Sequence, residues 1–245
     1  MAEKEWFIDW FNSPYYHLLY KNHDETEAEK FVTALAKELK IEPNTRILDV
    51  ACGKGRHSKM FHQLGFDVTG IDLSKNSIDF AKQFEDEKLH FAQWDMRQTF
   101  HENYFNVAVN LFSSFGYLPT EEDNLTALKA IASNLKQNGI LIIDYMNSEW
   151  VVKHLKAREI LQLGAIQFHI KRKVSAGFVV KEIQFLDEAG SDNEYEEKLR
   201  IIPLQKFEEL CSQSGLAIKN IWGNYELETF NSRTSPRIIL HCEKL

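Results

Sequence analysis

One stretch near position 50 decides the fold of this chain: Leu48-Asp49-Val50-Ala51-Cys52-Gly53-Lys54-Gly55. A buried strand over 46–51 runs into two closely spaced glycines, and a helix over about 56–64 follows. Glycines at this junction let the backbone approach a ligand, and the first turn of the helix offers unpaired N–H groups to an anion. The stretch therefore predicts a strand, a binding loop and a helix in direct succession.

The alternation of strand and helix extends on both sides of this stretch. A helix over 24–39, with Asp24 as its cap, is expected before the first strand. Helices capped by Ser74 and Thr120 are expected further along, and the second of them stops at Gly139. Four more strands are expected, over 66–72, 90–95, 105–111 and 140–144. This order predicts a parallel sheet with helices on both faces.

After about residue 164, short strands follow one another without helices between them. They are expected to be antiparallel and to form a β insertion, over 165–174, 178–186 and 197–202. A helix with Pro203 near its start stops at Gly215. Two final strands are expected after it, near 217–222 and 237–243.

The length of 245 residues fits one α/β domain with room for an insertion. We expect four parts within this single domain. They are an N-terminal aromatic arm or lid over 1–23, a cofactor-binding core over 24–160, the β insertion over 164–202, and the C-terminal helix with the last two strands over 203–245.

Composition and charge argue against several classes of protein. The chain is 44% hydrophobic and 27% charged, as in ordinary globular proteins, and no apolar run is long enough to span a bilayer. The net charge of −7 argues against a nucleic-acid partner, because gripping phosphates usually needs a basic face. Three scattered cysteines and the absence of a signal-peptide pattern favour a cytoplasmic protein with reduced thiols. The oligomeric state is not indicated.

Three acidic residues fall at the carboxyl ends of predicted strands: Asp49, Asp72 and Asp95. Open α/β sheets bind ligands at this edge, and a carboxylate after the second strand can accept from both hydroxyls of a ribose. Ser58 stands where a dinucleotide-binding loop has its third glycine, and Asp49 would repel a pyrophosphate. Near Asp49 an ammonium group is favoured instead, such as that of S-adenosylmethionine.

These residues occur in motifs that resemble those of class I S-adenosylmethionine-dependent methyltransferases. The motifs follow in order over roughly residues 30–150, at 48–55, 71–74, 94–96 and 110–118. The resemblance implies an α/β fold with a Rossmann-like seven-stranded sheet and helices on both faces. It also implies an antiparallel last strand, matching 237–243, and a small antiparallel β insertion after strand five.

The same resemblance implies S-adenosylmethionine as the cofactor and S-adenosylhomocysteine as the product. Asp49 and Gly53 would line the methionine part, Asp72 would hold the ribose, and Asn110 would lie under the sulfonium. The cofactor-binding residues that it implies are Asp49, Ala51, Cys52, Gly53, Gly55, Asp72, Leu73, Asp95, Met96, Asn110 and Phe112. No histidines and acids have the spacing of a metal site, so no metal is expected.

The N-terminal arm is unusually aromatic. It contains Trp6, Phe7, Trp10, Phe11, Tyr15, Tyr16 and Tyr20. One interpretation is an arm that packs against the edge of the sheet. The other is a lid whose hydroxyls, at Tyr16 and Tyr20, reach the cofactor while the rings exclude water. His57, just after the glycine loop, either faces solvent or points into the cleft.

Methyl transfer from a sulfonium is a direct displacement, in which the protein mainly aligns donor and acceptor. The stretch 110–118 is further similar to small-molecule methyltransferases, including amino-sugar N-methyltransferases, so a small-molecule acceptor methylated on N, O or C is expected. Candidate acceptor-pocket residues follow strands four and five: Ser113, Tyr117, Tyr145 and Asn147. Two alternatives stay open, a nicotinamide-dependent oxidoreductase and a non-catalytic cofactor-binding protein that acts through partners.

Overall fold

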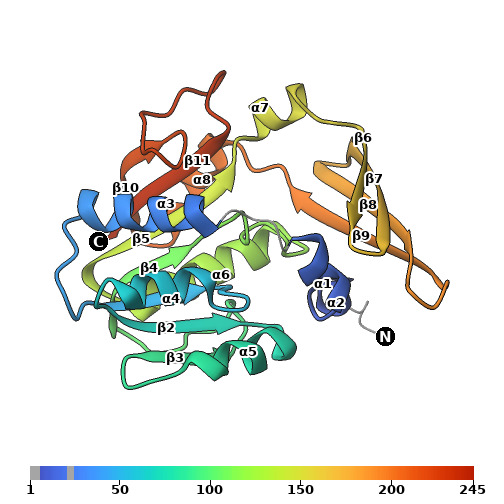
Figure 1. The fold of residues 1–245 in the computed structure, drawn as a ribbon. Coiled ribbons are helices and arrows are strands. Elements are labelled where there is room, and N and C mark those ends of the chain that lie inside the picture. Colours follow the sequence, from blue (N-terminus) through green and yellow to red (C-terminus); the bar gives the residue numbers. More distant parts are fainter. Residues whose placement is uncertain (1–5, 21–24) are drawn as a thin grey trace.

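Two sheets organise the chain in the computed structural model, which describes residues 6–20 and 25–245 (Figure 1). The larger has seven strands in the order β10-β11-β5-β4-β1-β2-β3. Strand β11 pairs antiparallel with both of its neighbours, and the other pairs are parallel. The expected Rossmann-like sheet is therefore confirmed. Its strands are β1 Arg46–Val50, β2 Asp67–Asp72, β3 Leu89–Gln93, β4 Phe105–Asn110, β5 Leu135–Met146, β10 Leu216–Trp222 and β11 Arg237–Lys244.

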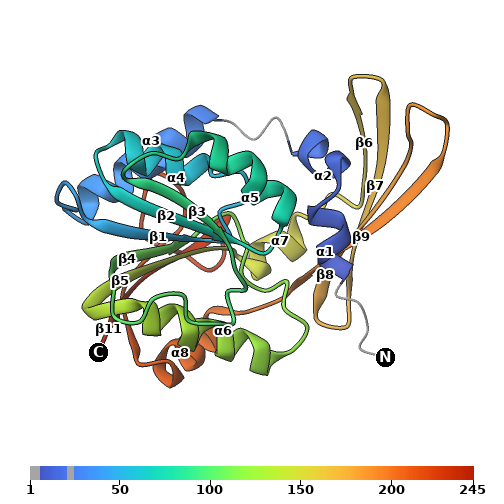
Figure 2. The same cartoon turned by 90° about the horizontal axis from the view of Figure 1, so that it is seen from below.

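Helices cover both faces of this sheet (Figure 2). On one face lie α3 (Glu25–Glu38), α4 (Arg56–Gln63), α5 (Lys75–Ala81) and the 3₁₀ turn η1 (Lys82–Phe84), and on the other lie α6 (Glu121–Asn134) and α8 (Leu204–Gln213). Successive strand residues point to opposite faces. Ile47 accordingly packs in the core under α3 and α4, and Leu48 packs in the core under α6 and α8.

Several element boundaries differ from the sequence prediction. Helix α6 begins with the predicted Thr120 cap, completed by Asp123, but it ends at Asn134 and not at Gly139. The Asn134 side chain accepts the N–H groups of Phe100 and His101, which fixes the chain there, and β5 starts at once. Strand β3 ends at Gln93, so Asp95 follows the strand instead of closing it. The proposed cap Asp24 lies outside the described residues.

The β insertion is a second, four-stranded antiparallel sheet, larger than expected. Its order is β6-β7-β8-β9, with β6 Arg158–Leu163, β7 Ile166–Ser175, β8 Phe178–Leu186 and β9 Asp192–Arg200. Strand β6 was missed because it is an edge strand that buries none of its side chains fully and so has no apolar run. The short helix α7 (Ser148–Lys153) leads from β5 to this sheet.

The N-terminal arm packs on the face of the insertion and also contacts the loops at the carboxyl edge of the large sheet. Its helices α1 (Trp6–Phe11) and α2 (Pro14–Leu19) lie between the two sheets in both views (Figures 1 and 2). Trp10 is 1% exposed and shares a third core with Phe168, Ile183 and Phe185 of the insertion. The side chains of Trp6 and Phe7 lie outside the described part of the chain. No helix in residues 6–20 and 25–245 is both long and apolar enough to cross a bilayer.

Gly116 joins the core to the insertion and provides a stability test. Its φ is +92°, and a Cβ there would lie 2.3 Å from the hydroxyl of Tyr145. We expect Gly116→Ala to lower the free energy of unfolding by about 2–4 kcal/mol, through backbone strain and overpacking. The control Gly177→Ala, at φ +80° with no atom within 4 Å, should cost only about 1–2 kcal/mol. Urea denaturation measures both, and equal losses would contradict the predicted clash.

Candidate active site

Strands β1, β2 and β4 end at one edge of the large sheet, and the loops after them form the candidate site. The loop after β1 passes through left-handed backbone at Ala51, Gly53 and Gly55, with φ of 59°, 56° and 75°. A Cβ at Gly55 would lie 2.5 Å from the ring of Phe91. Only glycine therefore lets α4 begin this close to the sheet, with its N-terminal N–H groups facing the loop.

Asp72, the last residue of β2, joins two of these loops. Its carboxylate accepts the N–H of Gly53 at 2.9 Å and the N–H of Ser74 at 2.7 Å. Burial raises the pKa of Asp72, and the two backbone hydrogen bonds oppose this rise. A carboxylate has about four acceptor positions, so Asp72 retains capacity for the two hydroxyls of a ribose.

Asp49 lies inside the sheet edge and is 1% exposed. Its carboxylate accepts the hydroxyl of Ser58 at 2.5 Å, which explains why serine replaces the third glycine of a dinucleotide loop. Burial raises the pKa of Asp49 to about 7, and the hydrogen bond from Ser58 works against that rise. A buried acid of this kind gains from a cationic partner, as the sequence predicted for an ammonium group.

The loop after β4 contains a buried acceptor atom without a donor. Asn110 is 0% exposed, and its side-chain nitrogen donates to the carbonyl of Val50 at 2.9 Å, which fixes the orientation of the amide. The Oδ1 atom of Asn110 has no hydrogen-bond partner among the described residues. Such an atom costs free energy unless a donor reaches it. The residue expected under the sulfonium thus has an acceptor to offer a ligand.

Phe112 and Ser113 are consecutive residues in left-handed backbone, with φ of 63° and 61°. Asp144, at the end of β5, stabilises this turn: its Oδ2 accepts the N–H of Phe112 at 2.8 Å and its carbonyl accepts the N–H of Ser113 at 2.9 Å. Arg237 pairs with Asp144 at 2.6 Å and also donates to the hydroxyl of Ser113 at 2.9 Å. Tyr225 donates to Asp144 at 3.2 Å.

Sequence reasoning missed Asp144 and Arg237. Arg237 belongs to the last strand, 93 residues after its partner, and no local pattern joins the two. It also missed Arg56, whose guanidinium lies over the ring of Phe112 at 4.5 Å and approaches His57 at 3.3 Å. His57 is 7% exposed and faces inward, so the interpretation as a solvent-facing residue is wrong.

Two of the four acceptor-pocket candidates have side chains that hydrogen-bond within the protein. Tyr145 is 0% exposed, and its hydroxyl donates to the carbonyl of Arg200. Asn147 caps α7 and donates to the carbonyls of Ser232 and Ser235, so its side chain holds the C-terminal loop. Their part in an acceptor pocket stays a prediction, and in this structure both side chains join segments of the protein itself. Ser113 and Tyr117 remain in the loop after β4.

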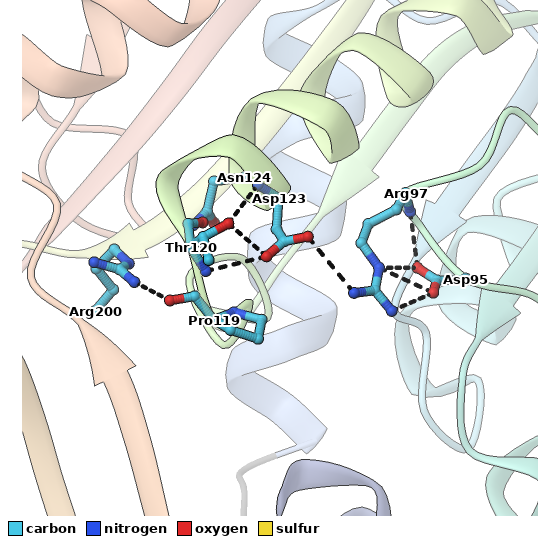
Figure 3. A network of polar contacts seen from close by, with 7 residues as sticks. All are labelled: Asp95, Arg97, Pro119, Thr120, Asp123, Asn124 and Arg200. Carbon is cyan, nitrogen blue, oxygen red and sulfur yellow. Dashed lines mark hydrogen bonds and ion pairs between the residues drawn. The ribbon is translucent and has the colours of Figure 1, made fainter. Parts of the chain in front are cut away.

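Asp95 is held by an ion pair that the sequence did not predict (Figure 3). Both of its carboxylate oxygens accept from Arg97, at 2.6–3.0 Å, and Arg97 also lies 3.7 Å from Asp123 at the start of α6. Burial alone would raise the pKa of Asp95, but the bonds from Arg97 outweigh burial and lower it. A cofactor group that donated to Asp95 would have to share this carboxylate with Arg97. The neighbouring Met96 is partly buried against the core under α6.

The remaining predicted cofactor residues lie around the same loops. Cys52 is buried, and burial raises the pKa of its thiol well above the usual range, which fits a packing role. Leu73 is half-buried and follows Asp72 directly, and its carbonyl accepts the side-chain amide of Gln93 at 3.1 Å.

The arm covers the rim formed by the loops after β2 and β4. Asn12 accepts the hydroxyl of Ser74 at 2.8 Å, and the ring of Phe11 contacts that of Tyr117 with centroids 5.1 Å apart. Burial raises the pKa of Tyr16, and the negative charges of Glu197 and Asp72 raise it further. The hydroxyl of Tyr20 is directed at Glu197 and Lys181 of the insertion, not at the strand ends.

Comparison with known proteins agrees with this geometry. A family model described as a methyltransferase domain matches residues 41–198, and the chain belongs to this family. Bacillus subtilis YqeM, itself named as a candidate methyltransferase, is 27% identical and aligns with 84% of this chain and 87% of its own. A crystal structure of an S-adenosylmethionine-dependent methyltransferase from Clostridium acetobutylicum has the same fold, with a TM-score of 0.79, 18% identity and coverage of 94% and 96%.

A third relative matches only in part. The dTDP-3-amino-3,4,6-trideoxy-alpha-D-glucopyranose N,N-dimethyltransferase of Streptomyces venezuelae is 36% identical over 40% of this chain and 41% of its own. The expected class, an S-adenosylmethionine-dependent methyltransferase, is thus confirmed.

The raised pKa of Asp49 predicts how cofactor affinity depends on pH. Below about pH 7 the buried Asp49 is protonated, and an ammonium group then gains no charge–charge attraction. We expect affinity for S-adenosylmethionine to fall about tenfold between pH 7.5 and pH 6, with proton release on binding. Isothermal titration in two buffers of different ionisation enthalpy measures both effects. Asp49→Asn should bind more weakly and without this pH dependence, and an unchanged profile would contradict the assignment.

Arg237 is expected to neutralise Asp144 and so to stabilise the turn after β4. Arg237→Ala would leave a fully buried carboxylate without a cation, and we expect the free energy of unfolding to drop by about 3–5 kcal/mol. Adding Asp144→Asn to this variant should recover part of the loss, because the uncompensated charge is gone. The exposed neighbour Arg233→Ala serves as control. Equal losses of unfolding free energy for Arg237→Ala and Arg233→Ala in denaturant unfolding would contradict this role.

Proposed function

We propose that this protein transfers the methyl group of S-adenosylmethionine to a small-molecule acceptor, with a nitrogen atom as the best supported target. One observation carries the proposal: three acceptor groups, on the buried Asp49 and Asn110 and the partly buried Asp72, surround a glycine loop at one sheet edge. Each suits a different part of one cofactor. Asp49 would accept the ammonium group, Asp72 the ribose hydroxyls, and the Oδ1 atom of Asn110 a further donor.

The cofactor supplies an electrophilic methyl group and a good leaving group. The protein then has to align the acceptor and exclude water. The turn at 112–113, which Asp144 fixes, is suited to aligning the acceptor. The arm that covers the rim is suited to excluding water.

Tyr117, in the loop after β4, is not available as the base that a hydroxyl acceptor would need. Burial raises the pKa of Tyr117 well above the usual range, so its hydroxyl is neutral near pH 7 and is no base. A hydroxyl acceptor needs a base, whereas a neutral amine attacks first and loses its proton afterwards. The Streptomyces venezuelae relative, named for N,N-dimethylation of an amino sugar, supports the same preference.

A cytoplasmic location is part of this proposal. Cys52, Cys211 and Cys242 are all free, although the sulfur atoms of the last two lie only 3.8 Å apart. Unpaired cysteines so close together fit a reducing compartment.

Cofactor binding tests the first half of the proposal. We expect S-adenosylmethionine to bind with clear preference over NAD in isothermal titration. Asp72→Ala should weaken binding by about 3 kcal/mol, roughly a hundredfold, because two hydrogen bonds to a charged group are lost. Asp79→Ala, an exposed acid on α5, serves as the control and should bind as the wild type. Selective binding of NAD, or an unchanged affinity of the Asp72 variant for S-adenosylmethionine, would contradict the proposal.

Turnover tests the second half. S-adenosylhomocysteine release is measured with a panel of amino sugars, amino acids and matched hydroxyl compounds. Turnover with amines is the expected result. Tight cofactor binding without turnover on the whole panel would favour the non-catalytic alternative, and turnover with hydroxyl compounds alone would overturn the preference for nitrogen.

A further inference from the structure

A second buried carboxylate, Glu197, lies outside the cofactor loops. It is on β9 of the insertion and is 6% exposed. Its oxygens accept the indole N–H of Trp10 at 2.6 Å and the hydroxyl of Tyr20 at 2.7 and 2.8 Å, and Lys181 of β8 lies 3.6 Å away. Both short hydrogen bonds come from the arm, and the cation comes from the insertion itself.

Burying a charge is costly unless hydrogen bonds and a counter-charge compensate for it. At 3.6 Å, Lys181 is a loose partner for Glu197, and its ammonium donates instead to the hydroxyl of Tyr20 at 2.6 Å. Tyr20 therefore joins the cation and the anion. Without the arm, Glu197 would lose both of its short hydrogen bonds and Lys181 would lose its nearest acceptor, so this pair is built to hold the arm.

The other side of the arm touches the cofactor loops. Asn12, two residues after Trp10, accepts the hydroxyl of Ser74 and also bonds Asn76 at 3.0 Å. Ser74 in turn donates its N–H to Asp72. A continuous set of contacts thus runs from Glu197 through the arm to the proposed ribose carboxylate.

Tyr16 lies in the middle of this arm. Its ring contacts Trp10, Phe11 and Tyr20, with centroids 5.7, 5.0 and 4.9 Å apart. Two of these three rings belong to the residues that Glu197 holds. A change at Glu197 would therefore move this aromatic cluster of the arm, although Glu197 makes no described hydrogen bond to the glycine loop.

We propose that Glu197 is a positioning residue of the active site, which holds the arm closed over the bound cofactor from the insertion side. The role rests on the proposed function, because it requires the cofactor in the cleft below the arm. It predicts that Glu197 governs how long the cofactor stays bound more than how fast it enters. An open arm removes the cover but leaves Asp49, Asp72 and Asn110 in place.

The test measures the dissociation rate of labelled S-adenosylmethionine in a filter-binding chase with excess S-adenosylhomocysteine. Glu197→Gln keeps the size of the side chain but removes its charge, and we expect dissociation about tenfold faster with a nearly unchanged association rate. Trp10→Phe, which removes the indole N–H and keeps an aromatic ring, should act in the same direction. Combined with Glu197→Gln it should add less than its separate effect, since both disrupt one contact.

Glu194→Ala, an exposed change on the same strand, is the matched control and should dissociate as the wild type. Thermal unfolding of each variant separates arm opening from general destabilisation, because a purely structural role would lower the melting temperature without changing dissociation from folded protein. Wild-type dissociation rates in both Glu197→Gln and Trp10→Phe would overturn the positioning role alone. A wild-type chain that binds no S-adenosylmethionine would overturn the proposed function, and this role with it.

Discussion

The candidate site depends on the carboxylate of Asp72. It receives the N–H of Gly53 from one loop and the N–H of Ser74 from the next, so two loops that meet only at the sheet edge hold one shape. Ser74 also donates to Asn12, which brings the arm to the same point. A single buried acid therefore organises the glycine loop, the cap of α5 and the cover of the cleft.

Buried carboxylates recur in this protein, and their partners differ with their roles. The carboxylate of Asp144 is compensated by Arg237, the N–H of Phe112 and the hydroxyl of Tyr225, which suits a residue that supports a turn. Glu197 is compensated by two side chains of the arm and so depends on the arm being in place. Asp49 accepts from the hydroxyl and the backbone N–H of Ser58, and burial still raises its pKa to about 7. A site for a cationic ligand requires a carboxylate of this kind, whose buried negative charge the protein compensates only in part.

The two sheets have different roles in the molecule. The large sheet positions the acidic residues through the carboxyl ends of β1, β2 and β4, as open α/β sheets do generally. In the described hydrogen bonds the insertion contributes no group to Asp49, Asp72 or Asn110, but its β9 anchors both the arm through Glu197 and the loop at Gly116 through the N–H of Arg200. The family fold thus provides the cofactor site, and the insertion and arm together form its cover.

The sequence by itself determined the strand–loop–helix at 46–63, the capping box of Thr120 and the placement of Asp49 and Asp72, because these features depend on residues within a few positions of one another. Only the tertiary structure decided that Tyr145 and Asn147 bond the carbonyls of distant loops, that Arg237 pairs with Asp144, and that Glu197 holds Trp10 across 187 residues. Such pairs leave no local pattern. Each forms only when the fold brings distant segments together and burial makes an unpaired charge too costly.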